Sequence, residues 1–391
     1  MPTKVSQSDR KKIPKLRFPG FEGEWEEKEM REISMIYDGT HQTPKYVNEG
    51  IKFVSVENIG NIEQVDKFIT REAFEKDFKI RPQRDDILMT RITAGIIGAT
   101  AIVRTNDPLG YYVSLALIRK KEGVTVDFLN QLIHGNRFKH ELHKRIIHVA
   151  FPKKINLGDI GRCSVFIPNT AEQQKIADFL TSIDQWIETL RVQKETLEAY
   201  KKEMTKEIFT QEIRFKNDDG KEFPEWKEKR LGEIAYITTG SSNREDSTVD
   251  GDYTFFDRSE DIRASSRYLF DTEAIIVAGE GQEFRPKYFV GKFDLHQRTY
   301  AIMNFKNSLS EFMFYYISYN RKYFNKMAVG STVPSLRLPM FNNMPISLPI
   351  TEEQQKIADF LTSIDRLMEA KQKQITQAEQ WKKGLMQNLF V

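Results

Sequence analysis

Short polar segments that could hydrogen-bond another molecule are the first feature of this 391-residue chain. The segment DGTHQTPKY, from Asp38 to Tyr46, places hydroxyls, an imidazole, an amide and an ammonium group between two apolar runs, and Pro44 restricts its backbone. Groups of these types bind base edges and phosphates in nucleic-acid complexes. The candidate contact residues in this segment are Thr40, His41, Gln42, Thr43 and Lys45.

The second half of the chain has a comparable segment with different letters. After the apolar run LGEIAYI the sequence reads TTGSSNRED from Thr238. Further polar side chains lie beside glycine turns and strand ends in RPQRDDILMTRITAG, AGEGQEFRPKYFVGK and GSTVPSLR, although any one of these loops could be an ordinary surface turn. The further candidates are Arg84 and Arg91 in the first half and Ser241, Ser242, Asn243, Arg244, Gln282, Arg285, Ser331, Thr332 and Arg337 in the second.

The sequence offers little catalytic apparatus. It contains no G-x-x-x-x-G-K-[ST] phosphate loop and no [DNS]-P-P-[FYW] motif for holding the amino group of a target base. The four histidines of HGNRFKHELHKRIIH, residues 134–148, have no accompanying Glu or Cys ligand set, and we interpret them as part of a polar helix face. We therefore predict neither catalytic nor metal-binding residues.

An internal repeat indicates what positions the polar loops. The stretch EQQKIADFLTSID begins at Glu172 and again at Glu353, an offset of 181 residues. Each copy follows a strand-like run that ends in proline, at Pro168 and Pro349. Each half therefore consists of an entry segment, a variable body, a strand and a repeated helix.

Both repeated segments continue as long amphipathic helices. Apolar residues recur at spacings of three and four, which is typical of a coiled-coil seam. A helix of about 40 residues is about 60 Å long. The alternative is that both stripes pack into one larger globular core. The stripe residues are Ile176, Leu180, Ile183, Ile187, Leu190, Leu197, Met204 and Ile208, and then Ile357, Leu361, Ile364, Met368, Ile375, Ala378, Leu385 and Leu389.

These elements predict an α+β fold with pseudo-twofold symmetry. Two globular mixed α/β bodies would be separated by two long helices that form a coiled-coil spacer. The second helix leaves the second body and finds its best apolar partner in the first helix, so the two must run antiparallel. The expected segments are a first body at 1–170, a first repeated helix at 171–212, a second body at 213–350 and a second repeated helix at 351–391.

Composition narrows the class of protein further. The formal net charge is +3, and the positive excess lies in residues 1–170, which permits nucleic-acid binding without demonstrating it. The single cysteine, Cys163, excludes an internal disulfide framework and suits a reducing compartment. No apolar run is long enough to span a bilayer and the N-terminus lacks a signal-peptide core. We expect a cytoplasmic protein without a membrane partner.

With these features the chain resembles the specificity subunits of Type I restriction-modification systems. The resemblance covers nearly the whole sequence: entry segments that end at Trp25 and Trp226, the DGTHQTP loop, and the phrases FIPNTAEQQKIADFLTSID and SLPITEEQQKIADFLTSID. It implies two target-recognition domains that read the two halves of a bipartite double-stranded DNA target. It also implies that the chain is not an enzyme but joins two modification subunits and, for cleavage, two restriction subunits.

The reactions implied for those partners are N6-adenine methylation and ATP-driven translocation with DNA cleavage. S-adenosylmethionine, ATP and Mg would be held by the partner subunits, and this chain would bind no cofactor. Near-identical docking surfaces would serve two identical partners, and we expect them around Ile176, Phe179, Ile357 and Phe360, where the repeated helices begin. Two other classes remain open: a non-catalytic two-headed scaffold without DNA specificity, and a solitary DNA-modifying enzyme.

Overall fold

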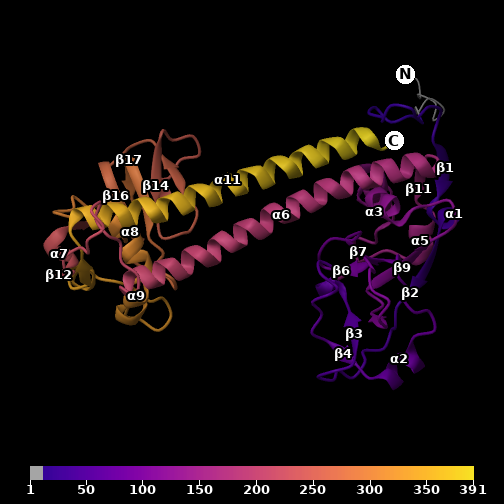
Figure 1. The fold of residues 1–391 in the computed structure, drawn as a ribbon, viewed down its shortest axis with the longest axis horizontal. Helices are drawn as coiled ribbons and strands as arrows, with labels where there is room; N and C mark the ends of the chain where they lie inside the picture. Colours follow the sequence, from indigo (N-terminus) through magenta and orange to yellow (C-terminus); the bar gives the residue numbers. More distant parts are fainter. Residues whose placement is uncertain (1–11) are drawn as a thin grey trace. The chain divides into compact units, whose positions relative to one another are not determined.

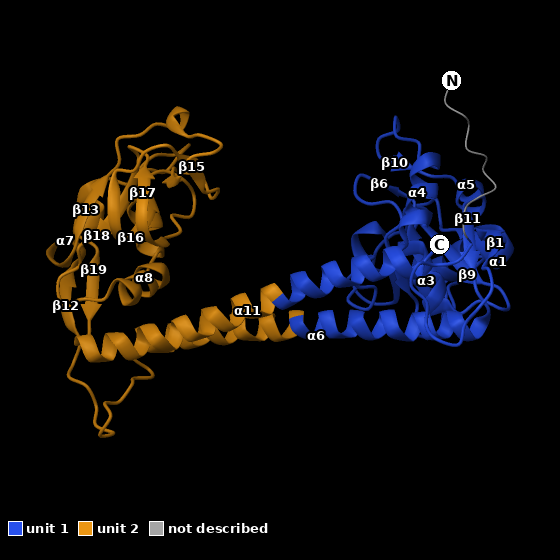
Figure 2. Ribbon diagram, turned by 90° about the horizontal axis from the view of Figure 1, so that it is seen from above, with its two compact units in different colours: residues 1–190, 374–391 blue, residues 191–373 orange. Residues whose placement is uncertain are grey.

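The computed structural model describes residues 12–391 and divides into two compact units. Unit 1 contains the chain up to Leu190 together with Gln374–Val391, and unit 2 contains Arg191–Lys373. Figure 1 shows the elements in chain order, and Figure 2 shows that both long helices pass from one unit into the other. The helices are therefore shared between the units and do not form a third body.

Unit 1 is built on two small sheets. The four-stranded sheet is antiparallel, with the order β2-β9-β5-β7, and the three-stranded sheet has the order β4-β3-β8 with β3 parallel to β8. All four residues of the apolar strand β5 are buried. The strands are β2 (Ser34–Asp38), β3 (Ile51–Val54), β4 (Phe68–Ile69), β5 (Ile87–Thr90), β7 (Thr100–Ile102), β8 (Leu109–Tyr111) and β9 (Leu115–Lys120).

Short ladders and helices close unit 1. The antiparallel ladder of β1 with β11 joins the entry segment to the strand that precedes the repeated helix, and β6 pairs with β10. The short strands are β1 (Glu26–Glu29), β6 (Ile92–Thr93), β10 (Lys153–Lys154) and β11 (Ser164–Ile167). The helices are α1 (Met30–Ile33), η2 (Val56–Asn58), α2 (Arg71–Asp77), α3 (Val126–His134), α4 (Asn136–Arg145) and α5 (Leu157–Gly161).

Unit 2 repeats this plan on one six-stranded sheet, β13-β18-β16-β17-β14-β15. Its first four strands match β2-β9-β5-β7 in order, and the nine-residue β17 continues through the places of both β7 and β8. The sheet strands are β13 (Tyr236–Thr239), β14 (Tyr253–Phe256), β15 (Arg263–Ser265), β16 (Phe270–Ala278), β17 (Lys287–Leu295) and β18 (Thr299–Met303). The remaining elements are β12 (Lys227–Arg230), α7 (Leu231–Ile234), η3 (Arg244–Asp246), α8 (Ser310–Tyr319), α9 (Lys322–Met327), α10 (Leu338–Asn342) and β19 (Pro345–Leu348), which pairs with β12.

The long helices α6 (Thr170–Phe209) and α11 (Thr351–Leu389) pair antiparallel, as predicted. In unit 1, Nζ of Lys382 on α11 lies 2.5 Å from Oδ1 of Asp184 on α6. In unit 2, Nζ of Lys201 on α6 lies 2.5 Å from Oδ1 of Asp365 on α11. The residue numbers rise on one helix as they fall on the other, and the predicted apolar stripe is largely buried between the helices and the units they cover.

The ends of these helices complete the core of each unit. Phe390 packs edge-on against Trp25, with ring centroids 6.2 Å apart, and beside Phe128. In unit 2 the corresponding contact joins Phe209 to Trp226 at 6.5 Å. Burying rings of this size contributes strongly to stability. Each unit thus needs the last turn of a helix that begins in the other unit.

The identical letters of the repeat fasten each helix to its own unit. The fully buried carboxylate of Glu172 accepts two hydrogen bonds from Arg17, at 2.8 and 2.7 Å. The next residue, Gln173, donates to the carbonyls of Gly123 and Pro168 at 3.0 and 2.9 Å and accepts from the backbone N–H of Thr125. These bonds satisfy a buried side chain and three backbone groups at once.

The second copy of the repeat makes the same contacts in unit 2. Glu353 accepts from Arg214 at 3.1 and 2.8 Å and also from Nε1 of Trp226 at 3.1 Å. Gln354 bonds the backbone N–H of Leu309 and the carbonyl of Pro349. Much of the repeated motif therefore holds the chain's own fold together.

In the part of the chain that the structure describes, no helix combines the length and apolar character that a membrane span requires.

Candidate nucleic-acid interface

The two polar loops found in the sequence occupy equivalent places at one end of their sheets. In unit 1 the loop after β2 forms a parallel bridge between Thr40 and Tyr112, in the turn before β9. In unit 2 the loop after β13 forms a parallel bridge between Ser242 and His296, in the turn before β18. The backbone hydrogen bonds also match, because Thr40 N–H donates to the Tyr111 carbonyl as Ser242 N–H donates to that of Leu295.

Each loop lies close against the backbone of the facing turn. A Cβ atom on Gly39 would come within 2.5 Å of the backbone of Tyr112, and one on Gly240 within 1.6 Å of the Leu295 carbonyl oxygen. A larger residue at either position would push the loop away. Glycine is therefore required by close approach in both loops.

In unit 1 the loop is held at its first residue, Asp38. Its carboxylate accepts from Nη2 of Arg91 at 2.8 Å and lies 2.9 Å from Nε2 of His41. Its carbonyl accepts from the Tyr111 hydroxyl at 2.7 Å. Burial raises the pKa of Tyr111, with the charge of Asp38 adding to the effect, so the hydroxyl stays protonated and remains a donor.

The side chains beyond this anchor point outward. His41, Gln42, Thr43 and Lys45 are exposed, and among residues 12–391 neither the Gln42 amide nor the Lys45 ammonium has a side-chain hydrogen bond to the protein. Thr40 is only 9% exposed, which makes it a bridge residue of the loop. This loop offers an amide and a cation to another molecule.

The loop of unit 2 is anchored on a buried carboxylate. Asp294 is fully buried and accepts from the Ser242 hydroxyl at 2.5 Å, the Ser265 hydroxyl at 2.8 Å and the Leu295 N–H at 2.8 Å. Nη2 of Arg267 donates to the Ser242 hydroxyl at 2.8 Å. Ser242, predicted as a contact residue, is buried and anchors the loop in this structure. Ser241, Asn243 and Arg244 remain exposed.

A second pair of loops adjoins the same end of each sheet. Arg91 accepts through its carbonyl from Ile155 N–H and donates through its N–H to the Ser114 carbonyl; Gly279 does the same with Leu336 and Arg298. Arg91 is 7% exposed and its guanidinium donates to both Asp38 and the Ile155 carbonyl. It is corrected from a contact residue to one that joins two loops.

The predicted residues of the second loop pair in unit 2 come together. Gly281 N–H donates to the Pro334 carbonyl, and Glu280 bridges to Ser335, so residues 279–285 and 329–336 lie side by side. Gln282, Ser331, Thr332 and Arg337 are exposed, and Arg285 is paired with Glu283. These loops adjoin the loop at Ser242 through the turn 296–298, where Nε2 of Gln297 donates to Oδ1 of Asn243.

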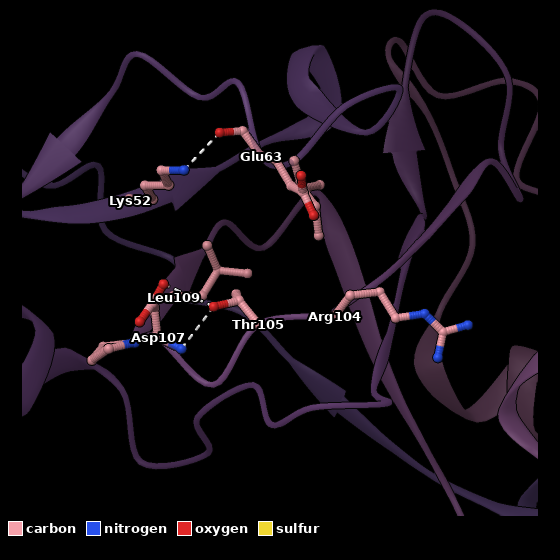
Figure 3. Close-up of a pocket in the computed structure, with 8 residues that line it drawn as sticks. Lys52, Glu63, Arg104, Thr105, Asp107 and Leu109 are labelled. Carbon is pink, nitrogen blue, oxygen red and sulfur yellow. Dashed lines mark hydrogen bonds between the residues drawn. The ribbon is translucent and has the colours of Figure 1, made fainter. Parts of the chain in front are cut away.

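Arg84 is separated from the other candidates of unit 1. It precedes β5, whereas the polar loop lies at the opposite end of that strand, and its guanidinium donates to the Arg104 carbonyl. At this far end lies a cavity of about 360 Å³, shown in Figure 3, with Lys52, Glu63, Arg104 and Asp107 on its walls. Lys52 is bonded to the Glu63 carbonyl at 2.6 Å. Arg84 therefore lies at the opposite end of the sheet from the polar loop, and its contact with DNA stays a prediction.

The residue types alone did not identify the two turns that face the polar loops. In unit 2 this turn carries His296, Gln297 and the half-exposed Arg298, which is ion-paired with Glu280 at 2.5 Å. Burial, with Arg258 as the next cause, lowers the pKa of His296, so the ring is neutral and its Nδ1 accepts from the Arg298 N–H at 3.0 Å. The order of strands could have located these turns, because each precedes the strand that pairs with the loop-bearing strand.

The predicted docking residues separate into two kinds. Ile176 and Ile357 are 2% and 1% exposed and pack inside their units, so they are corrected to internal core residues. Phe179 and Phe360 are half-buried, Phe179 against Phe18 and Trp381 and Phe360 against Phe215 and Tyr200. Among residues 12–391 no group of three or more His, Cys, Asp or Glu side chains is placed to hold a metal ion.

Comparison with known proteins agrees with this arrangement. The model of the Type I restriction modification DNA specificity domain matches residues 22–199 and again 224–380. The chain is 32% identical to the EcoDI specificity subunit of Escherichia coli over 40% of this chain and 35% of that protein. It is 26% identical to the putative MjaX specificity subunit of Methanocaldococcus jannaschii over 94% of this chain and 93% of that protein.

Two solved structures share the fold. The S subunit of a Type I restriction-modification system from M. genitalium superposes with a TM-score of 0.66 at 14% identity, covering 97% of this chain and 99% of that one. A chain from a structure on complex assembly and conformational transition of the Type I R-M system gives 0.56 at 16% identity over 96% and 99%. The match to the EcoDI subunit spans about a third of that protein's length. Because the family model matches both halves and together most of the sequence, the chain belongs to the family of Type I restriction-modification DNA specificity domains.

Proposed function

We propose that this chain is the non-catalytic specificity subunit of a Type I restriction-modification complex and reads a bipartite duplex target, one half-site per unit. The observation that carries the proposal is that the two units hold their polar loops by the same backbone contacts but with different side chains. The loops at Thr40 and Ser242 use the same backbone bonds but expose different side chains. Exposed amides, hydroxyls and cations that differ between two equivalent frames suit two different DNA sequences.

Along the chain, we propose that recognition domains alternate with spacer helices. Residues 1–170 and 213–350 act as recognition domains, and residues 171–212 and 351–391 act as spacer helices. The chain itself supplies no catalytic group. N6-adenine methylation is performed by two modification subunits that bind S-adenosylmethionine, and ATP- and Mg-dependent cleavage by two restriction subunits, all in the cytoplasm.

We assign docking of the modification subunits to the exposed face of the helix pair around Phe179 and Phe360. In unit 1 this face exposes Phe179, Trp186 and Trp381, the tryptophans being 47% and 49% exposed. The 181-residue offset places Phe360, Leu367 and Tyr200 at the same positions in unit 2, with Leu367 52% and Tyr200 47% exposed. Matching apolar patches suit two copies of one partner, which would cover them with a helix.

An exchange of one domain tests the reading of half-sites. Replacing residues 20–165 by the equivalent body of a relative is expected to change one half of the methylated sequence and leave the other half unchanged, as mapped on methylated adenines in the host genome. A change in both halves would contradict independent reading. Binding of the wild-type complex to all duplexes with equal affinity would support the scaffold alternative instead.

A charge substitution tests the docking face. Trp186→Asp combined with Leu367→Asp is expected to prevent assembly with modification subunits, because a carboxylate cannot be buried there without a partner. Val290→Asp, at a residue 63% exposed on the sheet of unit 2, is the matched control. Recovery of a complete three-subunit methyltransferase from the double variant, measured by mass, would place the docking surface elsewhere.

A further inference from the structure

The loops that adjoin the polar loop of unit 1 carry three strongly exposed apolar side chains. Val149 is 97% exposed, Phe151 92% and Ile96 78%. Isolated exposed apolar residues are ordinary, but neighbouring ones mark a contact surface. Residue type does not mark these three as candidates, because the groups that bind base edges and phosphates are polar.

The short ladder of β6 with β10 brings these residues to one place. Thr93 pairs with Lys153, so the segment after Thr93 and the segment before Lys153 leave the ladder at the same end. Figure 2 shows β6 and β10 side by side within unit 1. The loop of Ile96 is fixed at its base by Thr90, whose hydroxyl donates to the Ile96 carbonyl at 2.7 Å while the side chain of Ile96 faces solvent.

This apolar tip is continuous with the polar loop. The guanidinium of the buried Arg91 donates to the Asp38 carboxylate, which begins the polar loop, and to the carbonyl of Ile155, which follows β10. The tip is also flanked by cations, since Lys153 and Lys154 are exposed. A partner with apolar surface and negative charge within a few ångströms fits this combination.

The loop before Ile155 in unit 1 has an equivalent in unit 2, the loop before Leu336, and the two loops carry different side chains. Ile155 and Leu336 make the same backbone bond, to Arg91 and Gly279, and are 181 residues apart, which is also the offset of the repeated motif. The offset places Phe151 at the position of Thr332 and Ala150 at that of Ser331. Where unit 2 presents two hydroxyls, unit 1 therefore presents an aromatic ring.

We infer that Phe151, supported by Val149 and Ile96, is a wedge that inserts between base pairs of the half-site read by unit 1 while Lys153 and Lys154 hold the adjacent phosphates. The inference rests on the proposed function. Apolar side chains inserted at a base step unstack it, and the stacking energy of a base on an aromatic ring repays part of that cost. Unit 2 has Thr332 at the position of Phe151, and the exposed apolar side chains of that loop are the smaller Val329 and Val333, so an aromatic wedge is expected in unit 1 and not there.

The test uses the full chain assembled with its modification subunits and a duplex that carries its target. Phe151→Ala is expected to weaken binding by about fivefold or more, since stacking on one aromatic side chain contributes at least this much. Val290→Ala, which removes an apolar side chain of the sheet surface, is the matched control and is expected to leave binding unchanged. Because Phe151 is 92% exposed, thermal unfolding of the variant should match that of the wild type.

A fluorescent base identifies insertion directly. 2-Aminopurine placed at each step of the first half-site, beside but not at the methylated adenine, is expected to brighten in the wild-type complex and to stay quenched with Phe151→Ala. Phe151→Leu, which keeps an apolar wedge, should restore the signal, and 2-aminopurine in the second half-site should respond equally in all variants.

Three results would overturn the inference. Equal affinity and equal fluorescence for Phe151→Ala, in a complex that still discriminates both half-sites, would remove the wedge and leave the proposed function intact. Weaker binding without a change in fluorescence would mean a groove contact without insertion. Failure of the wild-type complex to distinguish its target from other duplexes would remove the proposed function and the wedge together.

Discussion

The two units hold equivalent loops by different chemistry. Unit 1 anchors its loop on Asp38, whose carboxylate is about one-third exposed and is paired with Arg91 at 2.8 Å. Unit 2 anchors its loop on Asp294, which is fully buried and whose carboxylate accepts hydrogen bonds from two hydroxyls and a backbone N–H. The backbone bridge is the same in both, so the frame tolerates a change of anchor. Exposed side chains can then differ freely without loss of the fold.

The two repeated helices make matching contacts in both units, whereas the anchors of the polar loops differ between the units. Asp184 binds Lys382 and Gln131 in unit 1, and Asp365 binds Lys201 and Tyr315 in unit 2. Both glutamates of the repeat are buried beneath an arginine. Identical letters therefore coincide with buried polar contacts, whose loss is costly.

The largest expected effect comes from the buried anchor. Asp294→Ala should lower the free energy of unfolding of unit 2 by about 3–5 kcal/mol, because it leaves two hydroxyls and an N–H without a partner in the interior. Asp38→Ala should cost only about 1–2 kcal/mol, since that carboxylate is partly solvated. Denaturant unfolding followed by hydrogen exchange of each unit measures both. Equal costs would mean that the two anchors are equivalent after all.

A second comparison concerns the glutamates of the repeat. In unit 2, Glu353 accepts hydrogen bonds from Arg214 and from Nε1 of Trp226. In unit 1, Glu172 accepts from Arg17 but not from Trp25, whose buried Nε1 has no partner among the described residues. Glu353→Ala should therefore destabilise unit 2 by about 1 kcal/mol more than Glu172→Ala destabilises unit 1. Denaturation midpoints of the two single variants give the difference. A larger loss from Glu172→Ala would contradict the assignment of the extra bond.

A third difference between the units depends on pH. Burial, followed by the charges of Lys139 and Lys382 and opposed by Asp184, lowers the pKa of His134 to about 4 from an ordinary 6.5. The unfolded chain therefore takes up a proton first as the pH falls. Stability from this residue is fully present above pH 6.5 and is lost between pH 6.5 and 4, by about 2–3 kcal/mol.

The matching residue in unit 2 is Ser318, three residues after Tyr315 as His134 is three after Gln131. Hydrogen exchange at pH 7 and at pH 4.5 should show unit 1 loosening more than unit 2, although the lowered pKa of His296 makes unit 2 lose some stability as well. His134→Asn removes the titrating ring and should abolish the excess. Parallel loosening of both units in the wild type would assign the acid sensitivity to other groups.

Much of this fold could be predicted because its signals are periodic and repeated. The two long helices and their antiparallel pairing follow from the 181-residue repeat and from apolar spacing, whereas the equivalence of the two polar loops follows from their place after the entry segment of each half. Burial at the loops could not be predicted in the same way. Ser242 is buried by a carboxylate 52 residues away and Arg91 by one 53 residues away, and such contacts depend on strand order. Arg84 and Arg91 were both candidates as arginines beside strand ends, and strand β5 places them at opposite ends of the sheet.

The last predictions concern exposed loop residues of unit 1, and they distinguish contacts that read the sequence from contacts that only bind the backbone. Gln42 presents a free amide that could form a bidentate contact with adenine, and Lys45 presents a cation that suits a phosphate. Gln42→Ala should therefore cost about 1–3 kcal/mol on the preferred sequence and broaden one position of the first half-site. Lys45→Ala should weaken all sequences alike and reduce the slope of log affinity against log salt by about one unit.

Competition binding on single-base variants of the target, at two salt concentrations, distinguishes these outcomes. The exposed hydroxyl of Ser241 in unit 2 gives the matched control, because Ser241→Ala should leave the first half-site unchanged while Gln42→Ala changes it. If neither Gln42→Ala nor Lys45→Ala altered affinity or preference, this loop would be an ordinary solvated turn. The reading surface of unit 1 would then have to lie along the segment after β6 and the segment before β10, where the exposed side chains are apolar and the code would be one of shape and stacking.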